Sequence, residues 1–245
     1  MTGMIAEFAR RGLTLLPQRA IWSAGARTLW VADLHLGKTA VFRKGGLPAP
    51  EGGGEETLSR LAMLIDELAP QRLIVLGDFI HARTGNTPDL HHQLRLWREA
   101  RPQIECLVVR GNHDRHAGDA PDDCGFIGVD EPFAVLGVEG RHHPIERATA
   151  LDSGPIVLAG HVHPMVRLSG RGRDSLRLPC FAVLGRQIVL PAFGEFTGGR
   201  LVHPREDWNV VIATGRELFE IRRFRATSAQ SAHIARRPLL DGRRP

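Results

Sequence analysis

Five short clusters along this sequence bring together aspartate, asparagine and histidine side chains. They are Asp33-Leu34-His35, Gly77-Asp78, Gly111-Asn112-His113-Asp114, His142-His143 and Gly160-His161-Val162-His163. Carboxylate oxygens, an amide oxygen and imidazole nitrogens suit divalent ions such as Mn, Fe or Zn better than a thiolate site would. Two such ions about 3.5–4 Å apart suit phosphoester hydrolysis, because they can clamp the attacking and the leaving oxygen. The clusters therefore indicate a two-metal hydrolytic site.

Apolar runs precede the first three clusters and predict the strands that would position them. Residues 28–32, 72–76 and 104–109 have the composition of buried strands, and residues 55–68 and 90–100 show helical spacing. A strand–helix–strand–helix–strand order implies parallel pairing with right-handed crossovers. In such a sheet the functional crevice lies outside the carboxyl ends of the strands, where the clusters stand.

The rest of the chain predicts further strands. Apolar stretches at residues 13–16 and 20–22 favour an N-terminal hairpin. Six short β-like runs between residues 133 and 221 are separated by Gly and Pro, which favours a second, more antiparallel sheet. Residues i and i+2 of a strand point to the same side. Asp33 with His35, and His161 with His163, are therefore each expected to offer two ligands to one cavity.

Composition bounds the class of protein. The chain has 245 residues, of which 42% are hydrophobic and 24% charged, and these are ordinary globular values. We expect one domain over residues 1–221. No apolar run approaches the length of a membrane span, and the first residues lack the apolar core of a signal peptide. The three cysteines do not suggest a disulfide framework, so a reducing cytoplasm is the expected compartment.

The positive charge is concentrated in residues 222–245. This segment holds seven arginines against one aspartate, whereas the remaining residues hold 25 basic and 26 acidic side chains. It lacks apolar periodicity, which predicts a disordered tail. Such a tail can bind nucleic acid through phosphates without reading sequence, or it can simply be solvated.

Taken together and in order, the clusters resemble those of the calcineurin-like metallophosphoesterases. That resemblance implies a four-layer αββα sandwich of two mixed sheets flanked by helices, covering about residues 13–221. A narrower resemblance, to the bacterial ligase-associated DNA damage response endonucleases (the PdeM group), rests on several phrases. These are LHLGK at residues 34–38, FR at 42–43, GLP at 46–48, GDFIHAR at 77–83, RGNHDRH at 110–116, HHP at 142–144 and LPAFGEFTGG at 190–199.

The resemblance implies a role for each ligand position. Asp33, His35, Asp78 and His163 would hold one metal ion. The other would be held by Asp78, Asn112, His142 and His161, with Asp78 bridging the two ions. His142 is preferred over His143, because the family ligand is the first residue after the strand. Many relatives carry Asp where this chain has His81, which is interpreted as a supporting or substrate-side group.

The same resemblance implies the groups around the metals. His113 would be the general acid for the leaving oxygen, and Asp114 would orient its imidazole. Candidate substrate contacts close to the motifs are Lys38, Arg43, Arg83, Arg115 and His116. Lys38 and Arg43 could equally lie in a solvated loop. Phe193 and Phe196 could stack on bases or pack in the core.

The leading hypothesis is a binuclear metal-dependent phosphodiesterase that acts on DNA. It would be a single-strand endonuclease in DNA repair that uses two divalent ions, Mn²⁺ before Fe or Zn. An ATP-dependent DNA ligase and a helicase are partners implied by the resemblance alone. One alternative is a phosphodiesterase or pyrophosphatase for a small nucleotide or sugar nucleotide. Another is a nucleic-acid-binding subunit with a vestigial metal site. The sequence indicates no membrane association and no oligomeric state.

Overall fold

The first sheet contains six strands in the order β1-β2-β3-β4-β5-β6. The computed structural model describes residues 4–48, 53–146, 154–170, 174–202, 209–221 and 234–236. Strands β3 to β6 are parallel, and β1 and β2 form the predicted hairpin beside β3. The strands are β1 (Leu13–Leu16), β2 (Ala20–Ser23), β3 (Thr28–Val31), β4 (Arg72–Leu76), β5 (Glu105–Val109) and β6 (Ile127–Val129).

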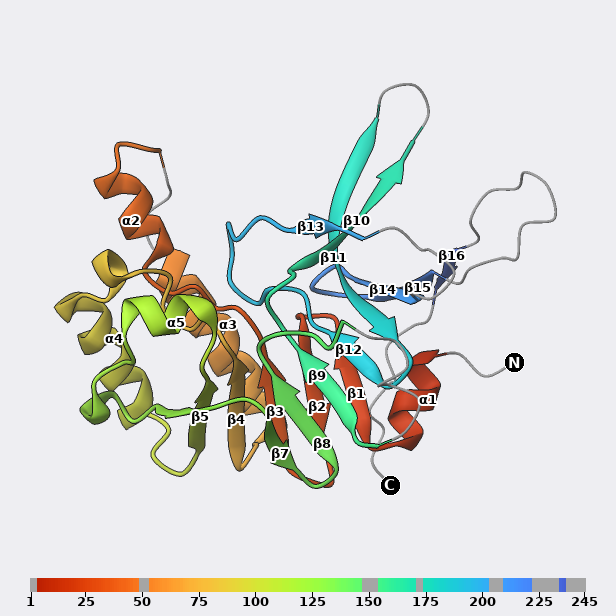
Figure 1. The fold of residues 1–245 in the computed structure, drawn as a ribbon, viewed down its shortest axis with the longest axis horizontal. Coiled ribbons are helices and arrows are strands. Elements are labelled where there is room, and N and C mark those ends of the chain that lie inside the picture. Colours follow the sequence, from red (N-terminus) through yellow and green to blue (C-terminus); the bar gives the residue numbers. More distant parts are fainter. Residues whose placement is uncertain are drawn as a thin grey trace.

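Helices cover one face of this sheet (Figure 1). They are α2 (Lys38–Lys44), α3 (Gly53–Leu68), α4 (Pro88–Glu99) and α5 (Asn112–Ala117), with short 3-10 turns η1 (Arg83–Gly85) and η2 (Asp122–Cys124). Helix α4 begins at Pro88, two residues before the predicted start at Leu90. The Thr87 side chain caps it by accepting a hydrogen bond from the backbone N–H of Leu90, and proline suits the first helical position because the N–H that it lacks would have no helical acceptor there. Helices α3 and α4 pack their apolar stripes against the sheet, and Leu61, Leu94 and Trp97 are the buried residues of these stripes.

The second sheet is mixed and runs in the order β16-β15-β14-β11-β12-β9-β8-β7. Strands β8, β9 and β12 pair in parallel, and the other neighbours along that path pair antiparallel. A hairpin of β10 (Pro164–Ser169) with the long β11 extends from it, and β13 (Arg200–Leu201) pairs with β10 (Figure 1). The remaining bounds are β7 (Phe133–Val135), β8 (Val138–Arg141), β9 (Ile156–Ala159), β11 (Ser175–Leu184), β12 (Gln187–Val189), β14 (Asn209–Ala213), β15 (Leu218–Ile221) and β16 (Ile234–Arg236).

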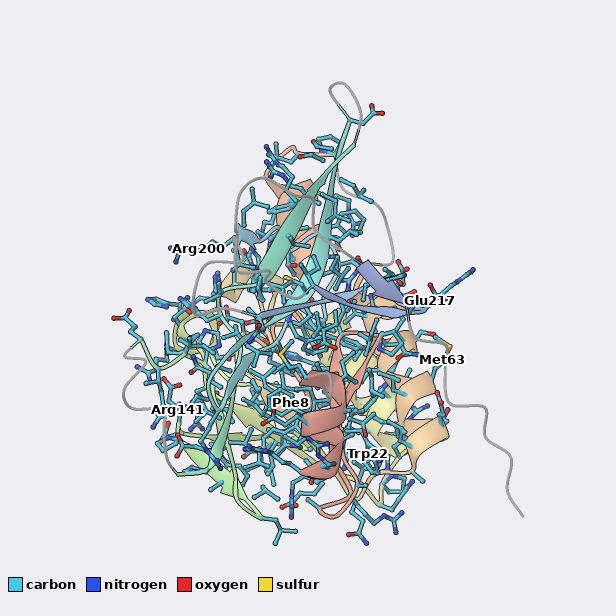
Figure 2. All side chains as sticks on the ribbon, turned by 90° about the vertical axis from the view of Figure 1, so that its right-hand side faces the viewer. Phe8, Trp22, Met63, Arg141, Arg200 and Glu217 are labelled. Carbon is cyan, nitrogen blue, oxygen red and sulfur yellow. The ribbon has the colours of Figure 1, made fainter. Side chains whose placement is uncertain are left out.

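An apolar layer joins the two sheets face to face. Trp30 and Ile74 of the first sheet pack with Leu158 and Phe181 of the second, and all four are fully buried. Helix α1 (Met4–Arg10), which the sequence reading missed, adds Phe8 to this layer (Figure 2). The predicted architecture of two mixed sheets with flanking helices is confirmed. Helices α2–α5 flank the first sheet, and α1 packs beside β1.

Most of the basic segment 222–245 lies outside the described residues. The backbone of Ile234–Arg236 nevertheless forms β16 on the edge of the second sheet, so these three residues depart from the expected disorder. All three cysteines are buried and free, in agreement with a sequence that suggested no disulfide framework. In the part of the chain that the structure describes, no helix is both long enough and apolar enough to cross a membrane.

Candidate metal centre

The carboxyl ends of parallel strands bring the five clusters to one edge of the sandwich. Asp33 follows β3, Asp78 follows β4, and Asn112 follows β5. His142 and His161 follow the parallel strands β8 and β9 of the other sheet. The backbone N–H of His161 donates to Asp33 Oδ2 at 2.9 Å, which connects the two sheets at this edge.

A first donor set consists of Asp33, His35, Asp78 and His163. One donor atom from each of the four lies within 4.8 Å of those of the other three. His35 Nε2 is 3.2 Å from His163 Nε2 and 3.7 Å from Asp78 Oδ2. His163 Nε2 is in turn 3.5 Å from Asp33 Oδ1. These are the four residues predicted to hold one ion.

A second donor set surrounds His142. Its Nε2 lies 2.9 Å from Asn112 Oδ1, 3.0 Å from His161 Nδ1 and 3.5 Å from Asp78 Oδ1. Asp78 therefore faces the first set with one oxygen and the second set with the other. This is the geometry expected of a carboxylate that bridges two ions.

His142 and His143 differ sharply in their surroundings. His142 is fully buried, and its Nδ1 lies 3.1 Å from the carbonyl of Leu76. Because a carbonyl only accepts, Nδ1 carries the proton and Nε2 is left free for a metal ion. The His143 ring is 43% exposed, and its Nδ1 is engaged by Glu131 Oε1 at 2.7 Å. The geometry favours His142 as the ligand.

The charges of the site fit a divalent cation. Asp33 and Asp78 are buried, and none of the described arginines or lysines forms a salt bridge with either. Burial, and next the neighbouring His163, lower the pKa of His35 from 6.5 to about 2, so its imidazole is neutral. Two buried carboxylates beside the neutral imidazole of His35 need a positive partner, and oxygen and imidazole donors suit a transition-metal ion.

The backbone at most of the ligand positions is not extended, as a strand would be. Asp33, His35, Asp78, His161 and His163 all have positive φ angles, between 47° and 70°. Each lies in a left-handed turn after its strand, so the alternation of a strand does not aim them. Asp33 and His35 still reach one donor set. His161 reaches the second set and His163 the first, which is the division that the family resemblance implied.

His81 stands directly behind a predicted ligand. Its Nδ1 lies 3.2 Å from Nδ1 of His35, on the side of that ring opposite the donor set. Burial, and next Lys38, lower the pKa of His81 to about 4, which leaves it neutral at ordinary pH. A neutral His81 can accept the Nδ1 proton of His35 and so hold the His35 ring with Nε2 toward the ion.

The predicted pairing of His113 with Asp114 is wrong. Asp114 Oδ1 accepts hydrogen bonds from the backbone N–H groups of Phe79 and Ile80, and Oδ2 accepts one from Gly111. It therefore holds the loops that carry the motifs, and burial raises its pKa. His113 instead donates from Nδ1 to the carbonyl of His81 at 2.6 Å. Its Nε2 lies 3.9 Å from Asp78 Oδ2, and the ring is 37% exposed.

The candidate substrate residues lie on three elements that adjoin one another, since α2 and α5 both pack against η1. Four of them are exposed: Arg43, Arg83, Arg115 and His116. Lys38 is partly buried and donates to the carbonyl of Thr197 at 3.3 Å, and burial lowers its pKa. Nδ1 of His116 donates to the carbonyl of Asn112, one turn earlier in the same helix. A contact with substrate stays a prediction for all five.

Comparison with known proteins decides the family. The model of the calcineurin-like phosphoesterase family matches residues 26–163, which include all five clusters completely. The chain belongs to this family. It is a metal-dependent phosphoesterase, as the motifs predicted.

Two known proteins are similar to this phosphoesterase. One is the Pseudomonas putida nuclease MPE, whose sequence is 40% identical. Its crystal structure matches with a TM-score of 0.70 over 83% of this chain and 92% of that one. A transmembrane protein with a metallophosphoesterase domain from Danio rerio is 21% identical over 192 residues. Those residues are 77% of the phosphoesterase described here but 39% of the Danio rerio protein.

Sequence reasoning missed Glu131 at this site. Its Oε2 accepts the backbone N–H groups of His142 and His143 at 2.8 and 2.9 Å, so it holds the turn that presents His142. Burial would raise its pKa, but the hydrogen bonds from His143 and His142 outweigh burial and lower it. Glu131 lies eleven residues before His142 in no recognisable motif, so no local signal could have identified it.

Proposed function

We propose that this phosphoesterase hydrolyses the phosphodiester bonds of DNA, as a single-strand endonuclease in DNA repair. The observation that carries the proposal is Asp78, whose two oxygens face two separate donor sets. A two-ion site is the arrangement suited to phosphodiester hydrolysis. Similarity to a nuclease at 40% identity supports a nucleic acid as the substrate.

In this proposal the two donor sets hold two divalent ions, for which we favour Mn²⁺. Asp33, His35, Asp78 and His163 would hold one ion, and Asp78, Asn112, His142 and His161 would hold the other. When bound, such ions supply a nucleophile at neutral pH and offset the negative charge on the phosphate. The Leu76 carbonyl and His81 keep the imidazoles of His142 and His35 turned with Nε2 toward the donor sets.

His113 is the proposed proton donor to the leaving oxygen. Its Nδ1–H is fixed on the His81 carbonyl, so Nε2 is the atom that exchanges a proton with substrate. The ring is accessible, unlike that of His142. Arg43, Arg83, Arg115 and His116 lie on α2, η1 and α5, the helix that also carries His113, and would contact phosphates that flank the scissile bond.

The test is cleavage of a circular single-stranded DNA by metal-stripped protein to which Mn²⁺ is restored. An aryl phosphodiester is assayed in parallel. Wild type should linearise the circle, and Asp78→Asn should lose at least 10²-fold in rate, the size of effect expected when a positioned charge is removed from such a site. The matched control is Asp89→Asn, an exposed aspartate in the first turn of α4, which should keep wild-type activity.

The outcomes separate the alternatives. Hydrolysis of the aryl ester without cleavage of DNA would move the substrate to a small phosphodiester. An Asp78→Asn variant that keeps full activity would refute the site itself. A partnership with an ATP-dependent DNA ligase and a helicase, and a place in the cytoplasm, belong to the same proposal and rest on the sequence resemblance.

A further inference from the structure

We propose that Phe196 forms a stacking platform for the nucleobase next to the scissile phosphate. The inference rests on the proposed function and deepens it, because it supplies a reason for a single-stranded substrate. Of the two phenylalanines that could stack on bases, Phe193 is fully buried under the guanidinium of Arg60. Phe196 is 54% exposed, although it lies only three residues further along the same loop.

The loop that carries Phe196 is held on both sides of it. The backbone N–H of Gly194 donates to the carbonyl of Asp33 at 3.1 Å, so the loop rests on the first motif. Glu195 forms ion pairs with Arg60 and, at 3.4 Å, with Arg19. The carbonyl of Thr197 accepts the hydrogen bond from Lys38. The exposed ring is therefore presented by a fixed backbone.

The backbone conformation of Phe196 also supports a binding role for its ring. Its φ is +56°, a region that bulky side chains rarely adopt and that costs free energy. Strain of this kind persists where the surrounding contacts impose it, and it is found at binding sites. Glu195 and Thr197 on either side are held by ion pairs and a hydrogen bond, whereas the Phe196 ring, on its strained backbone, stays half exposed.

The ring borders a cavity that begins at a predicted ligand. A volume of about 360 Å³ is lined by His163, Phe196, Arg19, Met165 and Arg177 among others, and this size suits a small-molecule group. Arg177 is exposed, and no described acid forms a salt bridge with it. A phosphate held at the donor sets would therefore place an adjoining base against Phe196 and a further phosphate near Arg177.

A nucleobase fits this cavity when it comes from a single strand. In a duplex each base is already stacked and paired, so its face is not available to a protein side chain. In a single strand the face is free, and stacking on an aromatic ring tolerates every base. The same geometry thus explains why an unpaired strand would be preferred and why no base sequence would be read.

The test compares Phe196→Ala and Phe196→Trp with Leu136→Ala. Leu136 is a matched control, because it is 79% exposed and also has positive φ, 44°, but it lies in the β7–β8 turn away from the donor sets. Each protein is loaded with Mn²⁺ and assayed on a thymidine oligonucleotide, on the same oligonucleotide with abasic sugars, and on an aliphatic phosphodiester. Thermal melting confirms that all four proteins are folded.

Phe196→Ala should raise KM for the thymidine oligonucleotide about tenfold or more, as loss of one stacked base predicts. It should leave KM for the abasic strand and the aliphatic ester unchanged. Phe196→Trp and Leu136→Ala should behave as wild type on all three. Equal KM values for Phe196→Ala and wild type, or the same rise on the abasic strand, would refute stacking while DNA cleavage stands. A wild type that cleaves only the aliphatic ester would overturn the proposed function and the stacking with it.

Discussion

His35 has a neighbour at each ring nitrogen, and this decides what the ring can do. Nε2 faces the first donor set, and Nδ1 faces His81. A ligand imidazole generally donates its second N–H to an acceptor, which fixes both the tautomer and the orientation of the ring. His81 provides that acceptor here.

We therefore expect His81→Ala to weaken metal binding by about 10- to 100-fold, the usual effect of losing such a partner. His81→Asp should restore most of the affinity, because a carboxylate can accept the same proton. Calorimetric titration of the metal-free protein with Mn²⁺ measures this. His92→Ala, which alters an exposed histidine of α4, is the control. Equal affinity for wild type and His81→Ala would show that His81 does not support His35.

At the scale of elements, the donor sets depend on how closely the strand ends pack. Gly111 precedes α5 at the end of β5, and a Cβ there would lie 2.7 Å from the backbone nitrogen of Asp78 and 2.8 Å from Cε1 of His142. Both are closer than real Cβ contacts, and neither the backbone nor the buried ring can move freely. The glycine thus allows three elements to meet.

Gly111→Ala should destabilise the fold by about 1–3 kcal/mol, as overpacking does, and should also weaken metal binding, because it displaces Asp78 and His142. Urea unfolding and Mn²⁺ titration measure the two effects. Gly25→Ala is the control, since nothing lies within 4 Å of a Cβ at Gly25. If Gly111→Ala bound Mn²⁺ as wild type does, the close approach would be irrelevant to the site.

Glu131 links the segment before β7 to the end of β8, and its charge makes that link dependent on pH. Its folded-state pKa is lowered from 4.5, because the hydrogen bonds from His143 and His142 outweigh burial. A carboxyl whose pKa is lowered on folding stabilises the native state above its unfolded pKa. That contribution is lost as the pH falls through the folded pKa.

Glu131→Gln should therefore lower the free energy of unfolding by about 1.5–3 kcal/mol at neutral pH, the range for hydrogen bonds to a charged group. The difference from wild type should shrink as the pH falls below about 4.5, the ordinary value of this carboxyl. Urea unfolding at several pH values measures it, with the exposed Glu67→Gln as control. A difference independent of pH would contradict the assignment.

The elements also explain how far the sequence predicts this molecule. The strands ending at Asp33, Asp78 and Asn112 were predictable, because apolar runs followed by polar clusters are local signals. The left-handed turns were not, because alternation describes only extended backbone. Helix α1 and the contacts of Asp114 and Glu131 were missed for a related reason: long-range hydrogen bonds and short amphipathic segments leave no distinctive spacing.

In the whole molecule, the excess positive charge and the proposed metal site lie in different parts of the chain. The donor sets lie in a body that is nearly neutral, whereas residues 222–245 carry a charge of +6. Only Ile234–Arg236 of that segment are described, and they pair with β15. A DNA-binding role for the segment is therefore best tested by changing its charge and keeping its length, so that β16 can still form.

Replacing the seven arginines of residues 222–245 with glutamine should weaken binding of single-stranded DNA and make its salt dependence shallower. Each lost phosphate contact should reduce the slope of log K against log salt by about 0.7. Fluorescence anisotropy in the presence of Ca²⁺ measures binding, and turnover of the aryl phosphodiester should not change. An unaltered slope would mean that the arginines are merely solvated.

The five left-handed ligand positions have a consequence for engineering this enzyme. A non-glycine residue in that conformation costs roughly 1–2 kcal/mol, and glycine avoids the cost. Directed evolution that rewards heat resistance alone, without rewarding turnover, would thus find some of its easiest gains at His35, His161 and His163, whereas Asp33 and Asp78 also accept backbone hydrogen bonds. Such a campaign would yield a sturdier protein that has lost its metals, so every round needs a catalytic screen.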